Sequence, residues 1–284
     1  MSPTDYVGLS AVPRPTPVER LPDWPSTVRG APNAVLRSAL FGAVGKGEKQ
    51  YLQKELLASV NGVEILYTGL RLDQVDFDLW LALIHMAKDY PAGEEIRVTA
   101  YQLLRLMGRA DTGGSRGTRE AIDTRITRLA NATVRIRVGK YSYEGALISG
   151  SYRDEAEHHY CITLNAKLLS LFGRDQYTEL DLAIRSTLMG KPLAQWLHGF
   201  YSSHASPGPI TVKTLHDLCG SEAKRIAHFR TELRNALADV QAAYRIHGQV
   251  FEAVIIEDVV HVTRTPSASQ LRHLERKGMA GDGL

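Results

Sequence analysis

One stretch in the C-terminal part of the chain carries side chains that could bind nucleic acid. Between residues 226 and 244, apolar residues recur every three or four positions, which predicts a helix with one buried face. A rotation of 100° per residue places six polar side chains on the opposite face and its flanks: Lys224, Arg225, His228, Thr231, Arg234 and Asn235. Each of them can hydrogen-bond a base edge or a phosphate. An amphipathic helix with a solvated outer face would show the same pattern, so this helix alone does not decide between the two interpretations.

A second stretch, from Arg105 to Arg153, concentrates positive charge. It holds ten basic and four acidic residues, a local net charge of +6. Such an excess is typical of a surface that contacts phosphates. A Gly113-Gly114-Ser115 loop precedes a predicted helix, whose free N–H groups would also suit a phosphate. The predicted contacts here are Ser115, Arg116, Arg119, Thr124 and Arg128, and Ser221 is added from the turn before the C-terminal helix. A solvated helix face with ordinary surface arginines is the alternative.

The elements that position the basic stretch are expected between residues 34 and 174. A β-hairpin is predicted at Leu56–Val60 and Val63–Thr68, because the intervening Asn61-Gly62 favours a type I′ turn. Asp73 can cap a helix that ends before Pro91. The remaining elements follow in order: a strand at 96–98, a helix at 101–107, a helix from 117 to about 131, strands at 133–138, 143–152 and 159–164, and a short helix at 166–172.

The same order of elements recurs in the C-terminal part. A helix at 192–203 is followed by a strand at 210–212, helices at 213–218 and 222–246, and a hairpin at 250–256 and 259–263. Strand, helix, turn, second helix and hairpin make a winged helix-turn-helix. We therefore expect an α+β fold with two tandem winged-helix domains, at residues 34–174 and 175–265. Seven of the twelve prolines lie in the first 32 residues, so we expect a flexible Pro-rich arm at 1–33, and a flexible tail at 266–284.

Composition narrows the class of protein. The chain has 284 residues, a net charge of +3, 44% hydrophobic and 23% charged residues, which is typical of a soluble globular protein. No apolar run is long enough for a membrane span, and the N-terminus lacks the pattern of a signal peptide. Cys161 and Cys219 have no CxxC partner. We therefore expect a reduced, cytoplasmic protein with no disulfide and no cysteine-based zinc site.

Three motifs that could carry chemistry lack the required spacing or context. The run Gly42–Gly47 differs from a phosphate-binding loop, which needs four residues between its glycines and a Ser or Thr after its lysine. His158-His159-Tyr160 is similar to the histidines and tyrosine of nicking enzymes, but adjacent strand residues point to opposite faces and cannot both reach one metal. Asp73, Asp76 and Asp78 complement a helix dipole. We expect no enzymatic activity, no metal site and no cofactor.

The N-terminal hairpin carries more apolar residues than one face of a small sheet needs. These residues are Leu57, Val60, Ile65 and Leu66. We expect some of them to cover a second copy of the chain.

Six short motifs occur in order between Trp24 and Arg264. They are Arg37-Ser38-Ala39-Leu40-Phe41, Tyr67-Thr68-Gly69, Leu171-Phe172 leading to Gln176-Tyr177-Thr178, Tyr201-Ser202-Ser203-His204, Leu218-Cys219-Gly220-Ser221 and Val259-Val260-His261. Through them the sequence resembles the TrfA-type replication initiators of broad-host-range plasmids, over most of the chain.

The resemblance implies a function and a set of partners. Such initiators bind directly repeated origin sequences (iterons) through tandem winged-helix domains, open an adjacent AT-rich region, and recruit the host's replicative helicase and its loader or initiator proteins. They have no catalytic activity of their own. The resemblance also implies a homodimer that is inactive and forms through the first domain.

One motif of the family is missing, and two other functions are open. Members can carry a sliding-clamp-binding segment of the Gln-Leu-Ser-Leu-Phe kind, whereas this N-terminus offers only Gly8-Leu9-Ser10, so a clamp contact by that route is doubtful. A winged-helix transcriptional repressor is the first alternative function, and an origin-nicking enzyme is the second.

Overall fold

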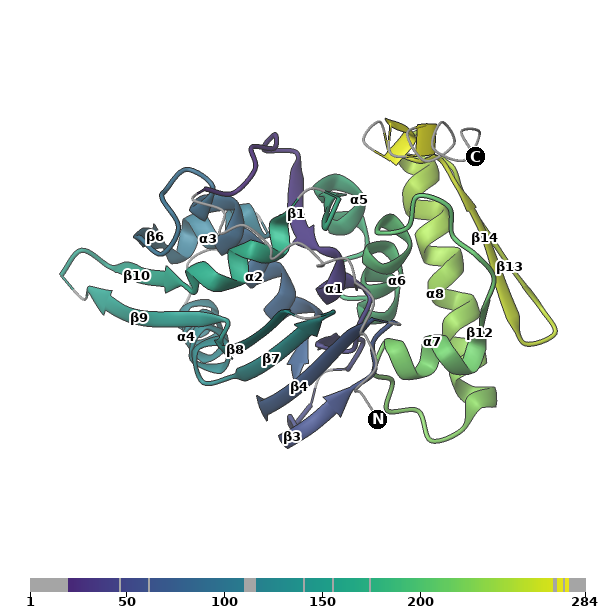
Figure 1. The fold of residues 1–284 in the computed structure, drawn as a ribbon, viewed down its shortest axis with the longest axis horizontal. Helices are drawn as coiled ribbons and strands as arrows, with labels where there is room; N and C mark the ends of the chain where they lie inside the picture. The colour runs from purple at the N-terminus through teal and green to yellow at the C-terminus, as the bar shows by residue number, and fades with distance from the viewer. Residues whose placement is uncertain are drawn as a thin grey trace, which may run out of the picture.

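The buried side chains form two separate hydrophobic cores. The computed structural model describes residues 20–45, 47–60, 62–109, 116–139, 141–154, 156–173, 175–267, 270–272 and 274–275. The first core runs from Leu21 to Leu180 and the second from Ile184 to Val262. They define a first and a second unit, which lie side by side (Figure 1). No helix in these described ranges is both long enough and apolar enough to span a lipid bilayer.

The first unit is built around helix α2 (Gln74–Ala87), which is buried on almost every side. As predicted, Asp73 caps this helix: its carboxylate accepts hydrogen bonds from the N–H groups of Val75 and Asp76, and the Asp76 carboxylate accepts one from the N–H of Asp73. Around α2 lie β6 (Glu95–Thr99), α3 (Ala100–Leu106), α4 (Arg116–Ala130), β9 (Ile148–Asp154) and β10 (His159–Leu164). The three strands form an antiparallel sheet in the order β6-β10-β9.

A second sheet of the first unit has four antiparallel strands. Its order is β3 (Tyr51–Leu57), β4 (Val63–Leu70), β7 (Thr133–Val138) and β8 (Tyr141–Ala146). The predicted hairpin is present as β3 and β4, although β3 begins and ends earlier than predicted. The single strand predicted over 143–152 is wrong. The chain leaves the sheet at the fully buried Leu147, so that β8 ends one sheet and β9 enters the other.

The second unit repeats the arrangement around α2 without the four-stranded sheet. Its elements are α6 (Pro192–Ser202), β12 (Ile210–Thr211), α7 (Val212–Leu218), α8 (Ile226–Ile246), β13 (Phe251–Ile256) and β14 (Val259–Arg264). They follow the order of α2, β6, α3, α4, β9 and β10. The strands also have the same sheet order, β12-β14-β13, with the last strand in the middle. Strands β7 and β8 are thus an insertion between α4 and β9 of the first unit.

The N-terminal segment belongs to the first core. Its elements are β1 (Val28–Pro32), α1 (Asn33–Leu36) and β2 (Phe41–Gly42). Further along the chain, β5 (Leu72–Asp73) precedes α2, and η1 (Ala166–Phe172), β11 (Tyr177–Asp181) and α5 (Leu182–Thr187) connect the two units. Strand β1 pairs with β11, and β2 with β5. Trp24 is 2% exposed, and its Nε1 donates to His85 Nδ1 over 3.0 Å. The prediction of a flexible arm up to residue 33 is therefore wrong from Leu21 onward; residues 1–19 lie outside the described ranges.

The C-terminal tail is also held in part. Gln270 Nε2 donates to the carbonyl of Ser202 over 2.7 Å, and Arg264 Nη1 donates to Gln270 Oε1 over 2.9 Å. These bonds attach the chain after β14 to the end of α6. The prediction of a tail that is flexible from residue 266 is wrong at this point, because Gln270 satisfies a carbonyl at the C-terminus of a helix.

Polar groups join the two units. The buried Arg185 Nε donates to Asp78 Oδ1 over 2.6 Å, and its Nη2 donates to Gln74 Oε1 over 3.1 Å. Trp196 Nε1 donates to the carbonyl of Ser38 over 3.1 Å. A buried guanidinium that shares its hydrogen bonds in this way is costly to separate from its partners. The joint therefore fixes α2 against α5 and α6.

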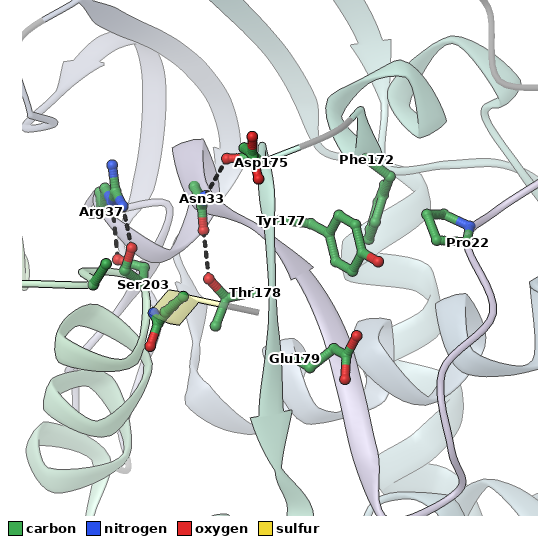
Figure 2. A pocket seen from close by; sticks show the side chains of 11 residues that line it. Pro22, Asn33, Arg37, Phe172, Asp175, Tyr177, Thr178, Glu179 and Ser203 are labelled. Atoms are coloured by element: carbon green, nitrogen blue, oxygen red, sulfur yellow. Dashed lines mark hydrogen bonds between the residues drawn. The ribbon is translucent and has the colours of Figure 1, made fainter. Parts of the chain in front are cut away.

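A hollow of about 470 Å³ opens beside this joint (Figure 2). Arg37 Nε donates to Ser203 Oγ over 2.9 Å, and Thr178 Oγ1 donates to Asn33 Oδ1 over 2.7 Å. The hydrogen bonds drawn in Figure 2 thus connect α1 with β11 and with the end of α6. These polar groups of the hollow are used within the protein, and they tie the two units together.

Candidate nucleic-acid interface

The first part of the interface is the turn before α8. The helix begins at Ile226, four residues later than predicted, and Arg225 is its N-cap with no side-chain cap bond. Lys224 and Arg225 therefore stand in the extended segment in front of the helix. Ser221 Oγ accepts a hydrogen bond from the N–H of Ala223 over 3.2 Å, so this side chain shapes the turn. The N-terminus of a long helix favours an anion, and Lys224 and Arg225 add two positive charges directly in front of it.

The second part is the exposed face of the first turns of α8. All six predicted polar side chains are exposed: Lys224, Arg225, His228, Thr231, Arg234 and Asn235. Within the described residues, Lys224, Arg225 and Arg234 make no ion pair or side-chain hydrogen bond. His228 Nδ1 lies 3.7 Å from Glu232 Oε1, and Thr231 Oγ1 donates to the carbonyl of Ala227. These six residues are here called the α8 cation surface, and its lysine and two arginines can meet a polyanion without first breaking an internal ion pair.

The hairpin of the second unit has a different character. Asp258 at its tip pairs with Arg230, so this arginine is directed toward the hairpin and away from the α8 cation surface. Glu252 and Glu257 are also exposed on the hairpin. Phosphates would be repelled here. The α8 cation surface is therefore the part of the second unit that suits DNA.

The charges of α4 are used differently from those of α8. Arg128 Nη1 lies 2.7 Å from Asp76 Oδ2, and Arg125 Nη1 lies 2.8 Å from Asp76 Oδ1. The Asp76 side chain is fully buried. Burial and the neighbouring Asp73 carboxylate raise the pKa of Asp76. Burial also acts to raise the pKa of Asp73, but Arg125, the N–H of Asp76 and Lys49 together hold it below its ordinary value. The prediction that Arg128 holds a DNA phosphate is wrong, because its guanidinium neutralises a carboxylate inside the first unit.

Other arginines of the basic stretch also have internal partners. Four further pairs are Arg109–Asp78, Arg135–Glu144, Arg137–Glu64 and Arg153–Asp123. Glu144 and Asp123 are already counted in the local net charge of +6, so it is the acids that precede the stretch in sequence that balance much of it. Arg119 and Thr124 are exposed on α4, and Thr124 Oγ1 donates to the carbonyl of Glu120 over 2.8 Å. Ser115 and the side chain of Arg116 lie outside the described residues.

The predicted dimer residues do not form one surface. Leu57 and Ile65 are buried in the first core, and Val60 packs against the second core. The prediction that these three cover a partner is wrong, because they already lie against the chain's own side chains. Leu66 is half-buried on the outer face of the four-stranded sheet, opposite Leu56, which is 63% exposed. Of the four predicted dimer residues, Leu66 therefore lies on the outer face of the sheet, next to Leu56, which was not predicted.

The tyrosine considered for strand cleavage has a structural environment. Tyr160 Oη donates to Asp123 Oδ1 over 2.5 Å, and this bond joins β10 to α4. Burial and then the bond to Asp123 raise the pKa of Tyr160. No group of three or more His, Cys, Asp or Glu side chains among the described residues could hold a metal ion. The surroundings of Tyr160 thus do not support a nucleophile beside a metal.

One contributor to the interface has no sequence signal. Arg71, in the first unit, donates to the carbonyl of Gly220 and lies 3.6 Å from Glu222. It therefore braces the turn that presents Lys224 and Arg225. The separation of 149 residues between Arg71 and Gly220 hides this contact from any local pattern.

Comparison with known proteins gives a consistent result. The family model described as TrfA protein matches residues 18–264. The plasmid replication initiator protein TrfA of Escherichia coli is 29% identical over 246 residues, which is 85% of this chain and 63% of that protein. The replication protein RepA of Salmonella typhi is 25% identical over 268 residues, 87% of this chain and 75% of that protein. The chain thus spans less than two thirds of the length of the first of these relatives.

A solved structure gives a likeness of fold. The crystal structure of domains 2 and 3 of RctB has a TM-score of 0.54 at 13% identity, covering 82% of this chain and 96% of that chain. A likeness at this identity concerns the arrangement of the elements alone.

Proposed function

The chain belongs to the TrfA protein family, and on this premise we propose that it is a plasmid replication initiator without catalytic activity. It binds directly repeated origin sequences (iterons), promotes opening of an adjacent AT-rich region and recruits the host's replicative helicase and loader or initiator proteins in the cytoplasm. The name of the Escherichia coli relative supports the biological role. The observation that carries DNA binding is the α8 cation surface, whose lysine and arginines have no internal partner among the described residues.

We propose that both units are winged-helix domains. The support is the shared order of helix, strand, two helices and hairpin, together with the shared sheet order in which the last strand lies in the middle. In this fold the second helix after the first strand enters the major groove. That helix is α4 in the first unit and α8 in the second. The likeness to RctB domains 2 and 3 agrees with such an arrangement.

The two helices would divide the work of recognition. The first turns of α8 hold side chains that form specific pairs with base edges, since arginine and lysine bind guanine and asparagine binds adenine. The first turns of α4, with Arg116, Arg119 and Thr124, together with Ser115, which precedes the helix in sequence, would contact phosphates and set the register. Arg128 is not part of this set. The joint through Arg185 and Asp78 would keep both helices on one duplex.

The homodimer is proposed to form through the outer face of β3 and β4. Leu56 and Leu66 lie opposite each other there, and β3 is the edge strand of its sheet. A two-fold contact suits inverted sites, whereas direct repeats require copies in the same orientation. The dimer is therefore the inactive form.

The test is a footprinting titration on a duplex that contains direct repeats of the cognate origin. The variant replaces Lys224, Arg225, His228 and Arg234 by alanine. We expect loss of the footprint, because these side chains form most of the α8 cation surface. Arg245→Ala is the matched control: it removes one exposed cation near the other end of the same helix and should leave the footprint in place. Equal affinity of the wild type and the quadruple variant would refute the proposal.

A further inference from the structure

Strand β13 is an open edge of the sheet in the second unit. It pairs only with β14 among the described residues. The N–H of Thr265 donates to the carbonyl of Val250, so Val250 and Thr265 are a hydrogen-bonded pair. In an antiparallel pair of strands, every second residue from such a pair turns its N–H and C=O toward the neighbouring strand. The register from Val250 onward therefore turns the backbone groups of Glu252, Val254 and Ile256 toward β14. Those of Phe251, Ala253 and Ile255 point to the open edge.

This edge lacks the features that usually protect an edge strand. It contains no proline, lysine or bulge, and two of the three exposed residues on its outer face are apolar: Val254 is 51% and Ile256 is 55% exposed, beside Glu252. Edges of this kind are templates for pairing with another strand. Charged DNA is a poor partner for them, because the nearest exposed charges on the hairpin are those of Glu252, Glu257 and Asp258.

A groove of about 460 Å³ runs beside the edge and gives it a side wall. Helix α8 forms that wall with Ala238, Gln241, Ala242 and Arg245, and the start of β13 forms the other side with Val250, Phe251 and Glu252. A strand added to β13 would therefore place every second side chain against α8. The two alanines leave room for an aliphatic side chain. The lining holds one cation, Arg245, on the α8 wall and one anion, Glu252, on the β13 side; Arg245 is exposed, without an ion pair among the described residues, and can pair with a carboxylate on the α8 side.

We propose that the edge of β13 and the α8 groove bind an extended peptide segment of a partner protein by strand addition. The segment has alternating aliphatic side chains that enter the groove over Ala238 and Ala242, and an acidic residue that pairs with Arg245. Main-chain hydrogen bonds to Ala253 and Ile255 give the affinity, and the groove gives the specificity. This inference rests on the edge and the groove alone and does not require the proposed DNA function.

The groove continues along α8 from the α8 cation surface: Ala238 follows Asn235 by three residues, and Arg245 lies at the far end of the groove. Arg234 and Arg245 are eleven residues apart on one helix, which corresponds to about 16 Å along its axis. The joint with the first unit lies on α5 and α6. A peptide at the Arg245 end of the groove would thus leave the joint and the turn that holds Lys224 and Arg225 free.

The test begins with random dodecapeptides displayed on phage and selected against the whole chain. The most enriched peptide is then synthesised with a fluorescent label, and its binding is measured by anisotropy. We expect an alternating aliphatic pattern with an acidic residue. Ala253→Pro removes an N–H that faces the open edge and leaves the ladder to β14 intact, and Ala242→Phe fills the groove. Each variant should weaken binding at least tenfold. Ala227→Phe, the same substitution near the start of α8, should not change peptide binding.

Hydrogen exchange locates the contact. The amides of Ala253 and Ile255 should exchange quickly in the free chain and slowly with the peptide, whereas the amide of Val254, which faces β14, should be protected in both states. Absence of an enriched peptide, or equal binding to the Ala253→Pro and Ala242→Phe variants, overturns the proposal. So does protection of the two edge amides by a higher concentration of the chain alone, which identifies a second copy as the occupant, or by an iteron duplex, which places the hairpin on DNA.

Discussion

Helices α4 and α8 occupy equivalent places in their units but use their cations in opposite ways. On α4, Arg125 and Arg128 reach the carboxylates of Asp73 and Asp76 at the start of α2. On α8, Arg234 has no such partner within the described residues, and Lys224 and Arg225 in front of the helix are equally unpaired. The many arginines in and around α4 thus belong to an internal ion-pair network, whereas the fewer lysine and arginine side chains at the start of α8 have no ion pair among the described residues. The count alone cannot distinguish the two, because the compensating acids are distant in sequence.

The largest expected effect concerns the α4 network. Asp76→Ala leaves two arginines beside a vacated buried site and removes one half of the capping box. Loss of one partner of a buried ion pair costs about 3–5 kcal/mol, so the free energy of unfolding should fall by that amount. Urea unfolding monitored by circular dichroism measures it. Glu144→Ala, which breaks the exposed pair with Arg135, is the control and should cost less than about 1 kcal/mol. Equal midpoints for Asp76→Ala and the wild type would mean that the network does not stabilise the first unit.

The next effect concerns the α8 cation surface. If Arg225 reads a guanine, Arg225→Ala should cost about 1–3 kcal/mol in binding to an iteron duplex and relax the preference at one base pair. Its stability should stay within about 0.5 kcal/mol of the wild type, because the side chain is exposed. Competition titrations with single-base variants of the duplex measure both quantities. If the base preference of the variant were unchanged at every position, Arg225 would contact a phosphate rather than a base.

A third experiment separates the arginines of α4 from one another. Arg119→Ala should lower the slope of log K against log salt by about 0.9 for one lost phosphate contact on duplex DNA, with specific and non-specific binding weakened alike. Arg128→Ala should leave this slope unchanged and lower the stability, since Arg128 faces Asp76. If Arg128→Ala changed the slope and Arg119→Ala did not, the contrast between the two helices would disappear.

The smallest expected effect concerns the outer face of β3 and β4. Leu66→Asp should give a monomer, because a charge opposite Leu56 opposes apolar contact with a second copy. At a concentration at which half of the wild-type chains are dimers, the variant should bind a single iteron about twofold better. Analytical ultracentrifugation and anisotropy measure the two properties. A wild type that is already monomeric at micromolar concentration, or a monomeric variant with no gain, speaks against an inactive dimer.

Local patterns predicted the elements that have local causes. Asp73 followed by Asp76 forms a capping box, and the apolar period from Ile226 to Tyr244 forms the buried face of α8. The order of elements in both units could be predicted for the same reason. The side chains that α8 exposes could be predicted too, since the buried stripe fixes the opposite face.

Features that depend on distant contacts could not be predicted. Trp24 lies among prolines that favour an irregular arm, and contacts with distant residues order it: the bond to His85, the rings of Phe172 and Tyr177, and the pairing of β1 with β11. The assignment of Arg128 to DNA failed because its partner, Asp76, precedes it by 52 residues. The break at Leu147 depends on two sheets that meet there, which no local periodicity shows.

If α4 and α8 both read DNA as proposed, the buried bond between Arg185 and Asp78 would fix the spacing between the two DNA segments that they contact. One base pair inserted between the segments that they contact moves one segment by about 3.4 Å along the duplex and by about a tenth of a turn around it. The joint could follow only by breaking its ion pair. A repeat with altered internal spacing would then engage one unit at a time. A plasmid could in this way distinguish its own origin from that of a coresident plasmid by the internal spacing of the repeats as well as by their base sequence.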